Sequence, residues 1–311
     1  MRPAPDWLVV TPRVAAALAG SRPVVALESA VFSHGLPAEA SARLASRLGA
    51  AVEEAGALPA LVAVRDGRAE VGIDLGEWQF LTAPQVLKLS ERDLPFAVAR
   101  RRSGGTTVAG TLAIAHAAGI RVMATGGIGG VLLGAEGTGD VSADLVALSR
   151  YPLVVVCGGA KVFCDHRRTA EALESLGVPV VGYRTGTLPA FLTGESGLSV
   201  PHRVDHPAEI AAMARAWTRM GGQAALLVVQ PPPAGVALAA PELDHAVAHA
   251  MARARREGVA GPEVTPFLLN ALAQATGGRT VETNLALLEA NARLAAEIAA
   301  AWFSEERAAS S

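Results

Sequence analysis

The chain has 311 residues, of which 51% are hydrophobic and 18% charged, and its formal net charge is −2. Both signs of charge are spread along the chain, so no basic surface for nucleic acid or for an anionic membrane is expected. The apolar runs are too short to span a bilayer and the first residues lack a signal-peptide core, which favours a cytoplasmic protein with no membrane partner. The two cysteines, Cys157 and Cys164, have no metal-type spacing and fit a reducing compartment.

Strand and helix patterns alternate along the chain. The first part predicts a helix over residues 12–19, a buried strand over 23–27, a helix over 38–55 and a hairpin over 60–72 that turns at Asp66-Gly67. Further helices are expected over residues 84–89, 108–118, 169–176, 207–220, 241–257, 265–276 and 283–303, and further strands over 122–124, 153–157, 178–182 and 224–229. This alternation predicts an α/β fold with helices on both faces of a sheet, built as one domain over residues 1–311, with a frayed tail from 304 onwards.

Two apolar runs, residues 122–124 and 153–157, each end in a cluster of glycines. That pattern is typical of a buried strand that leads into a tight loop. Ligands of open α/β sheets bind at such carboxyl ends of strands. Asp140, Ser142 and Asp144 lie between the two runs, and Lys161 follows the second cluster. The sequence therefore predicts a site built from these two loops.

Lys161 and Lys88 are the only lysines in the chain, against 27 lysine and arginine residues in total. An arginine keeps its proton in proteins, whereas a lysine can lose it and form a Schiff base. Lys161 is therefore a candidate nucleophile. The alternative is that a lysine was retained by chance on the surface, and this alternative carries more weight for Lys88.

Glu28 stands at the tip of the apolar strand over residues 23–27, close to Ser33 and His34. A carboxylate at such a place belongs more often to a site than to a core, whereas His34 alone could equally be a structural histidine. Further along, Thr106 and Thr107 follow two glycines just before a predicted helix. These residues could bind an anion or simply cap the helix, and the two interpretations are compatible.

Standard motifs for nucleotide binding and for serine hydrolases are absent, since no register satisfies GxGxxG, a Walker loop or a nucleophile elbow. Other strings resemble the pseudouridine-5′-phosphate glycosidase family, also called the indigoidine synthase A-like family. They are VALES and SHGLP in residues 24–37, RDLPF at 92–96, GGTTVAGT at 104–111, ATGGIGGV at 124–131, DVSADL at 140–145, VVVCGGAK at 154–161, GVPVVGYRT at 177–185, LPAF at 188–191 and TPFLL at 265–269. These strings cover the chain nearly end to end.

The resemblance implies an enzyme that reversibly cleaves the C–C glycosidic bond of pseudouridine 5′-phosphate to give uracil and ribose 5-phosphate. It implies Lys161 as the catalytic lysine, Glu28 as the acid–base residue and Asp140 as the ligand of Mn²⁺ or another divalent metal. The residues that it implies for substrate binding are Lys88, Val108, Ser142, Ala143, Asp144 and Asn284. It also implies a three-layer α/β/α sandwich with a mixed, mostly parallel central sheet, assembled as a homotrimer.

The implied chemistry agrees with the residues. A glycosidic carbon is a poor leaving group, so hydrolysis by two carboxylates alone is inadequate. Opening the ribose ring and attaching C1′ to Lys161 as an imine divides one hard step into easier ones. Glu28 would move the protons of ring opening and closure.

Two departures from the family pattern bear on the aglycone. Leu132 and Leu133 stand where the family usually has His-Arg, and Gln230 replaces the asparagine of an Asn-Pro pair. Two leucines suit a flat apolar aglycone better than uracil. We therefore favour a C-glycosynthase that joins ribose 5-phosphate to an aromatic, polyketide-like aglycone, as relatives in antibiotic biosynthesis do. The alternative within the family is an ordinary pseudouridine-5′-phosphate glycosidase; the alternative outside it, a non-catalytic sugar-phosphate binder, conflicts with the presence of Lys161 and Glu28.

Overall fold

A mixed, mostly parallel sheet forms the middle layer of the computed structural model, which describes residues 5–309 except the side chains of 262 and 305–309. Within these residues the eleven strands are β1 (Leu8–Val10), β2 (Val24–Leu27), β3 (Leu58–Arg65), β4 (Arg68–Ile73), β5 (Leu87–Leu89), β6 (Gly104–Thr106), β7 (Val122–Ala124), β8 (Val154–Cys157), β9 (Val180–Tyr183), β10 (His202–Val204) and β11 (Leu226–Val229). Their order is β1-β4-β3-β2-β7-β8-β11-β9-β10, and β6 pairs with both β3 and β5. Strand β3 runs antiparallel to β4 and β6, and the other described pairs are parallel.

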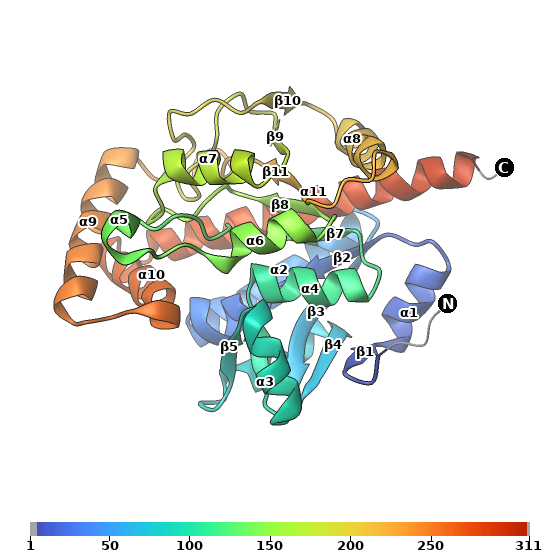
Figure 1. Ribbon diagram of the computed structural model, residues 1–311, viewed down its shortest axis with the longest axis horizontal. Helices are drawn as coiled ribbons and strands as arrows, with labels where there is room; N and C mark the ends of the chain where they lie inside the picture. Colours follow the sequence, from blue (N-terminus) through green and yellow to red (C-terminus); the bar gives the residue numbers. More distant parts are fainter. Residues whose placement is uncertain (1–4, 310–311) are drawn as a thin grey trace.

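Helices cover both faces of this sheet (Figure 1). One face carries α1 (Pro12–Ala19), α4 (Val108–Ala117), α6 (Ala143–Arg150) and α7 (His166–Ser175), and the other carries α2 (Ala38–Glu54), α8 (Pro207–Arg219) and α11 (Arg279–Ala309). The remaining helices are α3 (Leu94–Ala99), α5 (Ala135–Thr138), α9 (Ala240–Arg256) and α10 (Val264–Ala275), with short turns η1 (Val31–Gly35), η2 (Leu75–Thr82), η3 (Glu91–Asp93) and η4 (Gly261–Glu263). The predicted three-layer α/β/α sandwich is confirmed.

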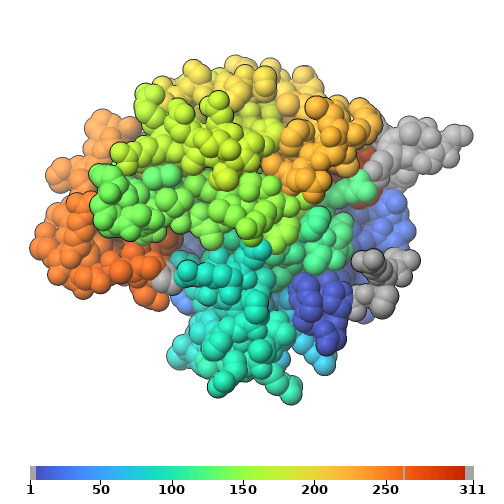
Figure 2. Space-filling view, viewed as in Figure 1, coloured from blue at the N-terminus to red at the C-terminus, as the bar shows by residue number. Residues whose placement is uncertain are grey.

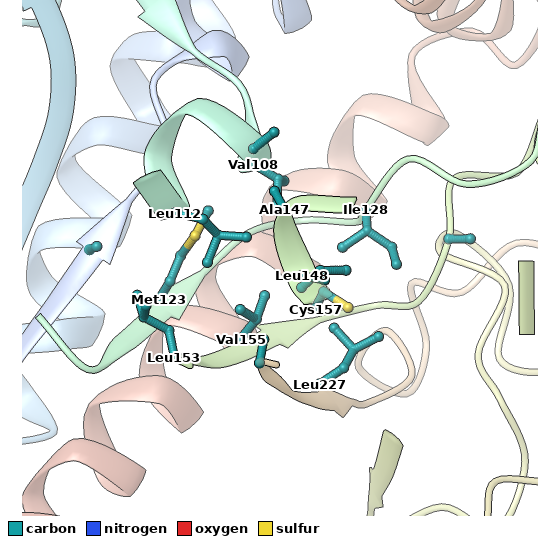
Figure 3. Packing of buried hydrophobic residues seen from close by; sticks show 14 of the residues in the cluster. Val108, Leu112, Met123, Ile128, Ala147, Leu148, Leu153, Val155, Cys157 and Leu227 are labelled. Carbon is teal, nitrogen blue, oxygen red and sulfur yellow. The ribbon is translucent and has the colours of Figure 1, made fainter. Parts of the chain in front are cut away.

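The strands divide the core into two clusters because successive side chains of a strand point to opposite faces. In β8, Val155 and Cys157 belong to the cluster under α4 and α6, whereas Val154 and Val156 belong to the cluster under α11. Figure 3 shows the first pair beside Leu148 of α6. Leu148 is fully buried, so its replacement by alanine is expected to cost about 2–5 kcal/mol of stability.

The carboxyl ends of β2, β7 and β8 meet at one edge of the sheet because these strands are adjacent and parallel. Strand β6 also ends near these carboxyl ends, although it runs antiparallel to β2, β7 and β8. It pairs with the part of β3 that extends beyond β2, and it runs antiparallel to β3. The backbone N–H of Thr106 consequently donates to Ser29 Oγ over 2.9 Å, directly after β2. Four segments distant in sequence thus end at one place.

The structure corrects the sequence-based assignment in several places. The helix expected over residues 84–89 is wrong, because Leu87 donates its N–H to the Ser103 carbonyl and leads into β5. Helix α11 continues to Ala309, so the frayed tail from 304 is also wrong up to that residue, and residues 310–311 lie outside the described part. The short strands β1, β6 and β10 and the helices α3 and α6 were not predicted. None of the helices within residues 5–309 is both long and apolar enough to cross a membrane.

Candidate active site

A cavity of about 370 Å³ lies at the carboxyl ends of β2, β7 and β8. Its lining includes every residue for which the family resemblance implied a catalytic, metal-binding or substrate-binding role: Glu28, Lys88, Val108, Asp140, Ser142, Ala143, Asp144, Lys161 and Asn284. These residues come from six separate segments of the chain. They meet in one concave cavity at the carboxyl ends of the parallel strands, which is where ligands bind in open α/β sheets.

Glu28 follows β2 directly, and the Thr125 hydroxyl donates a hydrogen bond to its Oε1. Burial raises the pKa of Glu28 above its ordinary value, while the positive charge of Lys161 and the Thr125 hydrogen bond act in the opposite direction. The charge of Asp144 adds to the upward shift. A carboxyl group whose pKa is raised keeps its proton more readily than an exposed one, which suits a general acid–base role.

Lys161 is held by two glycine loops that join side by side. Gly158 donates its N–H to the Gly126 carbonyl over 2.8 Å, and Lys161 donates its N–H to the Ile128 carbonyl over 3.0 Å. Gly159 has a φ of +88°, and a side chain there would run into the Pro189 carbonyl. Only glycine fits this turn, which carries the chain from β8 to Lys161.

Lys88 shares the cavity with Lys161. Burial lowers the pKa of Lys88, and the positive charge of Lys161 lowers it further. The carboxylates of Asp144, Glu263 and Glu28 counteract this shift. Two ammonium groups in one partly enclosed space favour an anionic ligand such as a phosphate ester.

The Asp144 carboxylate links two separate backbone segments, which the sequence did not predict. It is only 6% exposed, and its Oδ1 accepts the N–H of Ala109 at 3.0 Å while its Oδ2 accepts the N–H of Gly129 at 2.8 Å. Its own N–H donates to Ser142 Oγ over 3.2 Å, at the start of α6. The carboxylate therefore ties the first turn of α4 to the glycine loop after β7 and fixes the backbone around Val108.

The two threonines before α4 serve the fold. Thr107 caps α4, since its hydroxyl accepts the N–H of Gly110 at 3.5 Å. Thr106 is fully buried and donates its hydroxyl to the Val62 carbonyl over 2.8 Å. The capped helix start is thus confirmed. Thr107 also lines the cavity together with Val108, so anion binding there stays a prediction.

Asn284 and Ser90 bring unsatisfied polar atoms to the cavity. Within the described residues, Asn284 Oδ1 and Ser90 Oγ are buried and have no hydrogen-bond partner, and both residues line the cavity. Gly126 leaves room for this arrangement, because a Cβ there would come within 2.9 Å of Asn284 Oδ1. An unpaired buried polar atom costs about 1–3 kcal/mol, so both atoms are expected to bond to a ligand. Ser90 was missed, since nothing in its sequence context distinguishes it.

Asp140 lines the cavity after Gly139, and its carbonyl accepts the N–H of Leu132 at 3.1 Å. Within the described chain no group of three or more His, Cys, Asp and Glu side chains is placed to hold a metal ion. A single carboxylate suits a hard cation such as Mn²⁺ when water supplies most of the other ligands. The donor set therefore fits an ion held by Asp140 and water, and the metal stays a prediction.

One wall of the cavity is apolar and includes Leu132, Phe163, Phe191, Leu269 and Leu288. Leu132 pairs with Cys164 in an antiparallel bridge, so the next side chain points the other way. Leu133 is accordingly 38% exposed and does not line the cavity. The expectation that both leucines would pack against an aglycone is wrong for Leu133.

Other titratable groups near the site are not activated. Burial raises the pKa of Cys157 to about 12 and that of Cys164 to about 11, so neither thiol is a nucleophile at neutral pH. Burial also lowers the pKa of His34, whose Nδ1 lies 2.7 Å from Ser33 Oγ. His34 lines the cavity as a neutral ring.

The fold and the cavity place the chain in the class of α/β/α proteins whose ligand-binding cavity lies at the carboxyl ends of the central strands. Residues 13–301 match the family described as "Indigoidine synthase A like protein". The chain belongs to this family, which confirms the resemblance seen in its motifs.

Relatives and solved structures agree with this assignment. The chain is 49% identical to the pseudouridine-5′-phosphate glycosidase of Herpetosiphon aurantiacus, over 95% of this chain and 98% of the relative, and 46% identical to that of Paracoccus denitrificans, over 96% and 99%. The crystal structure of the prealnumycin C-glycosynthase AlnA in complex with ribulose 5-phosphate has a TM-score of 0.89 and 39% identity, over 98% of this chain and 99% of the other. An indigoidine synthase A-like protein from Thermotoga maritima has a TM-score of 0.88 and 33% identity, over 96% and 98%.

Proposed function

We propose that the protein acts on the C–C bond between C1′ of ribose 5-phosphate and an aglycone, and that it cleaves pseudouridine 5′-phosphate to uracil and ribose 5-phosphate. The relatives that are 46–49% identical over nearly their whole length carry the name of this activity. The observation that carries the proposal is the presence of Lys161 in one cavity with Glu28, whose pKa burial raises. This revises the preference for synthesis that the two leucines suggested, since only Leu132 lines the cavity.

Together, Lys161 and Glu28 can divide the cleavage reaction into steps. The Lys161 amine bonds to C1′ as the C1′–O4′ bond opens, and Glu28 delivers the proton that O4′ takes up. The Glu28 carboxylate left behind then accepts the proton that the newly bonded nitrogen loses. The nitrogen lone pair then forms the imine while the C1′–carbon bond breaks, and its electrons stay with the uracil carbon, which accepts a proton. Water finally hydrolyses the imine, which releases the aldehyde of ribose 5-phosphate and returns the Lys161 amine.

Other cavity residues are proposed to hold the substrate. Lys88 supplies positive charge for the phosphate, and the unpaired Oδ1 of Asn284 accepts a hydrogen bond from the ligand. Val108 and Ala143 contribute backbone groups, and Ser142 and Asp144 shape the wall beside them. Asp140 would hold Mn²⁺ or another divalent ion with water, and the bound ion would add positive charge near the substrate oxygens.

The direct test supplies pseudouridine 5′-phosphate with Mn²⁺ and measures uracil and ribose 5-phosphate in equal amounts. Lys161→Ala serves as the control for background hydrolysis. Absence of both products from wild-type protein, despite normal binding of ribose 5-phosphate, would reject cleavage of this substrate.

A C-glycosynthase is the second candidate. Its support is Leu132, which brings an apolar side chain to the cavity where the family usually has histidine, together with the likeness to the C-glycosynthase structure. The discriminating experiment offers ribose 5-phosphate with either uracil or an electron-rich aromatic carbon nucleophile. Faster coupling to the aromatic compound would favour synthesis. A non-catalytic binder would show neither coupling nor borohydride trapping.

We also propose that the chain assembles as a homotrimer and works in the cytoplasm, as its family resemblance implies. Sedimentation equilibrium of the purified protein tests the assembly. A mass equal to one chain at micromolar concentration would contradict it.

A further inference from the structure

A series of buried hydrogen bonds lies beneath the cavity and ends at Glu28. Its central member is Asn291 of α11, which is fully buried. Asn291 Nδ2 donates to the Thr125 carbonyl over 2.7 Å and approaches the Gly126 carbonyl at 3.4 Å. Asn291 Oδ1 accepts a hydrogen bond from Gln230 Nε2 at 2.8 Å.

The orientation of the Asn291 amide is determined by its partners. The carbonyls of Thr125 and Gly126 can only accept, so the amide NH₂ must face them and the amide oxygen must face Gln230. Gln230 is anchored in turn, because its backbone N–H donates to the Cys157 carbonyl over 3.1 Å at the end of β8. The chain of contacts thus joins the ends of β11, β8 and β7.

Thr125 carries this constraint to the site. It is fully buried directly after β7, and its N–H donates to the Val156 carbonyl over 3.0 Å. With its carbonyl held by Asn291 and its N–H held by β8, its backbone cannot rotate, and its hydroxyl donates to Glu28 Oε1. One carboxylate oxygen is therefore fixed relative to the sheet.

Packing alone does not account for an asparagine at this position. Its neighbours along α11, Leu288, Ala292 and Leu294, are buried and apolar, so a leucine would fill the same space. A buried amide is unfavourable unless it is hydrogen-bonded, and both ends of this amide are bonded to groups at the carboxyl edge of the sheet. Its arrangement serves the strand ends that form the site.

We propose that Asn291, held by Gln230, is a positioning residue that fixes the Glu28 carboxylate through Thr125. The inference rests on the acid–base role proposed for Glu28. The charged groups that face Glu28 are Lys161, Lys88 and Asp144, and none of them belongs to this chain of contacts. Loss of the Thr125, Asn291 or Gln230 side chain would leave those charges in place. It would release the Glu28 carboxylate from its fixed orientation.

The test uses three variants that remove one member each, Thr125→Val, Asn291→Leu and Gln230→Met, with Thr276→Val as the matched control. Thr276 is also buried, and its hydroxyl donates to the Leu272 carbonyl over 2.8 Å in α10, away from Glu28. Two readouts are taken: the pH dependence of kcat, and the titration of the Glu28 carboxyl carbon by ¹³C NMR, assigned with Glu28→Gln.

Loss of the Thr125 hydroxyl removes a bond that favours the charged carboxylate, so the Glu28 midpoint should move to higher pH. The kcat of Thr125→Val should fall about tenfold with little change in KM, since misplacement of a catalytic group by an ångström lowers rates by one to two orders of magnitude. Asn291→Leu should show a smaller shift in the same direction and Gln230→Met the smallest. Thr125→Ser should restore both readouts.

A purely structural role would lower the melting temperature of Asn291→Leu while its Glu28 titration matched wild type, and that result would overturn the proposal. Gln230→Met keeps the test open if Asn291→Leu does not fold, because Gln230 is partly exposed and keeps its backbone bond. An unshifted midpoint in both Gln230→Met and Thr125→Val would equally reject it. The NMR titration needs no turnover, so it separates failure of this inference from failure of the proposed function.

Discussion

The two walls of the cavity differ in how their backbone is held. The strand-end wall, which we define as Glu28, residues 125–130 and residues 158–161, is tied together by the joined glycine loops, by Asp144 and by Thr125. The outer wall, which we define as residues 132–141 and 261–269, consists of the loop around α5 and the start of α10. Helix α5 lies between Gly134 and Gly139, both with left-handed φ, and most of its residues are exposed.

Helix α9 borders the outer wall. In Figure 2 the surface of α9 and α10 lies beside that of the loop around α5, and Arg255 of α9 contacts Gly134 there. Both departures of residues 132 and 133 from the family pattern fall in this wall. The comparison suggests that the strand-end wall carries the shared chemistry and the outer wall carries selectivity for the aglycone. The predictions below separate the two.

Substitution of Lys161, in the strand-end wall, should have the largest effect on activity. Lys161→Ala removes the nucleophile and Lys161→Arg replaces it with a group that keeps its proton, so both should lose at least about a thousandfold in kcat. Borohydride reduction with ribose 5-phosphate should add the mass of the sugar to the peptide that contains Lys161. Lys88→Arg, which keeps a positive charge, is the control and should still be trapped. Trapping that persists in Lys161→Ala would contradict the assignment.

Substitution of Asp140, in the outer wall, should have the second largest effect on activity. Exhaustive chelation should lower activity and Mn²⁺ should restore it. Asp140→Asn, which loses the negative charge of the proposed ligand, should need far more Mn²⁺ to reach the same rate. Glu136→Gln is a matched control, because Glu136 lies on α5, pairs with Arg168 and does not line the cavity. An unchanged rate after chelation would remove the metal from the proposal.

Leu132 tests selectivity within the same wall. Leu132→His restores a hydrogen-bond donor to the cavity, so it should increase kcat/KM for pseudouridine 5′-phosphate about tenfold relative to coupling of an aromatic nucleophile. Leu133→His is the matched control, since that side chain points away from the cavity, and it should change the ratio less than about twofold. Equal effects of the two substitutions would show that the cavity wall does not set this preference.

Glu28 should have a small effect on stability with a defined pH dependence. Its pKa is raised in the folded state, so the stability linked to its protonation is present below its ordinary value of 4.5 and is lost as pH rises through the folded value. Glu28→Gln removes this loss and should melt about 2 °C higher than wild type at pH 7, with the difference shrinking towards pH 4.5. Thermal melts across this range measure this difference, with Glu53→Gln, at an exposed position of α2, as the control. A difference that does not vary with pH would contradict the raised pKa.

The sequence by itself determined the local elements and the chemical groups of the site. The apolar runs of β2, β7 and β8 are visible because buried parallel strands are continuously hydrophobic, and the glycines after them mark where loops expose a ligand site. Glu28 and Lys161 could be assigned because each follows such a strand. Their motifs identified the family, which the comparisons confirmed.

The tertiary structure alone decided which groups act together. Three-residue strands such as β5 and β6 are too short for a periodic signal. They form only because β3 extends beyond β2 to pair with β6, and β6 in turn pairs with β5, which places Lys88 in the cavity. The contacts of Asn291 with Thr125 and of Asp144 with Ala109 join residues far apart in the chain. Such contacts depend on sheet order and on the packing of α11 and α4, and neither is encoded in the local spacing of residues.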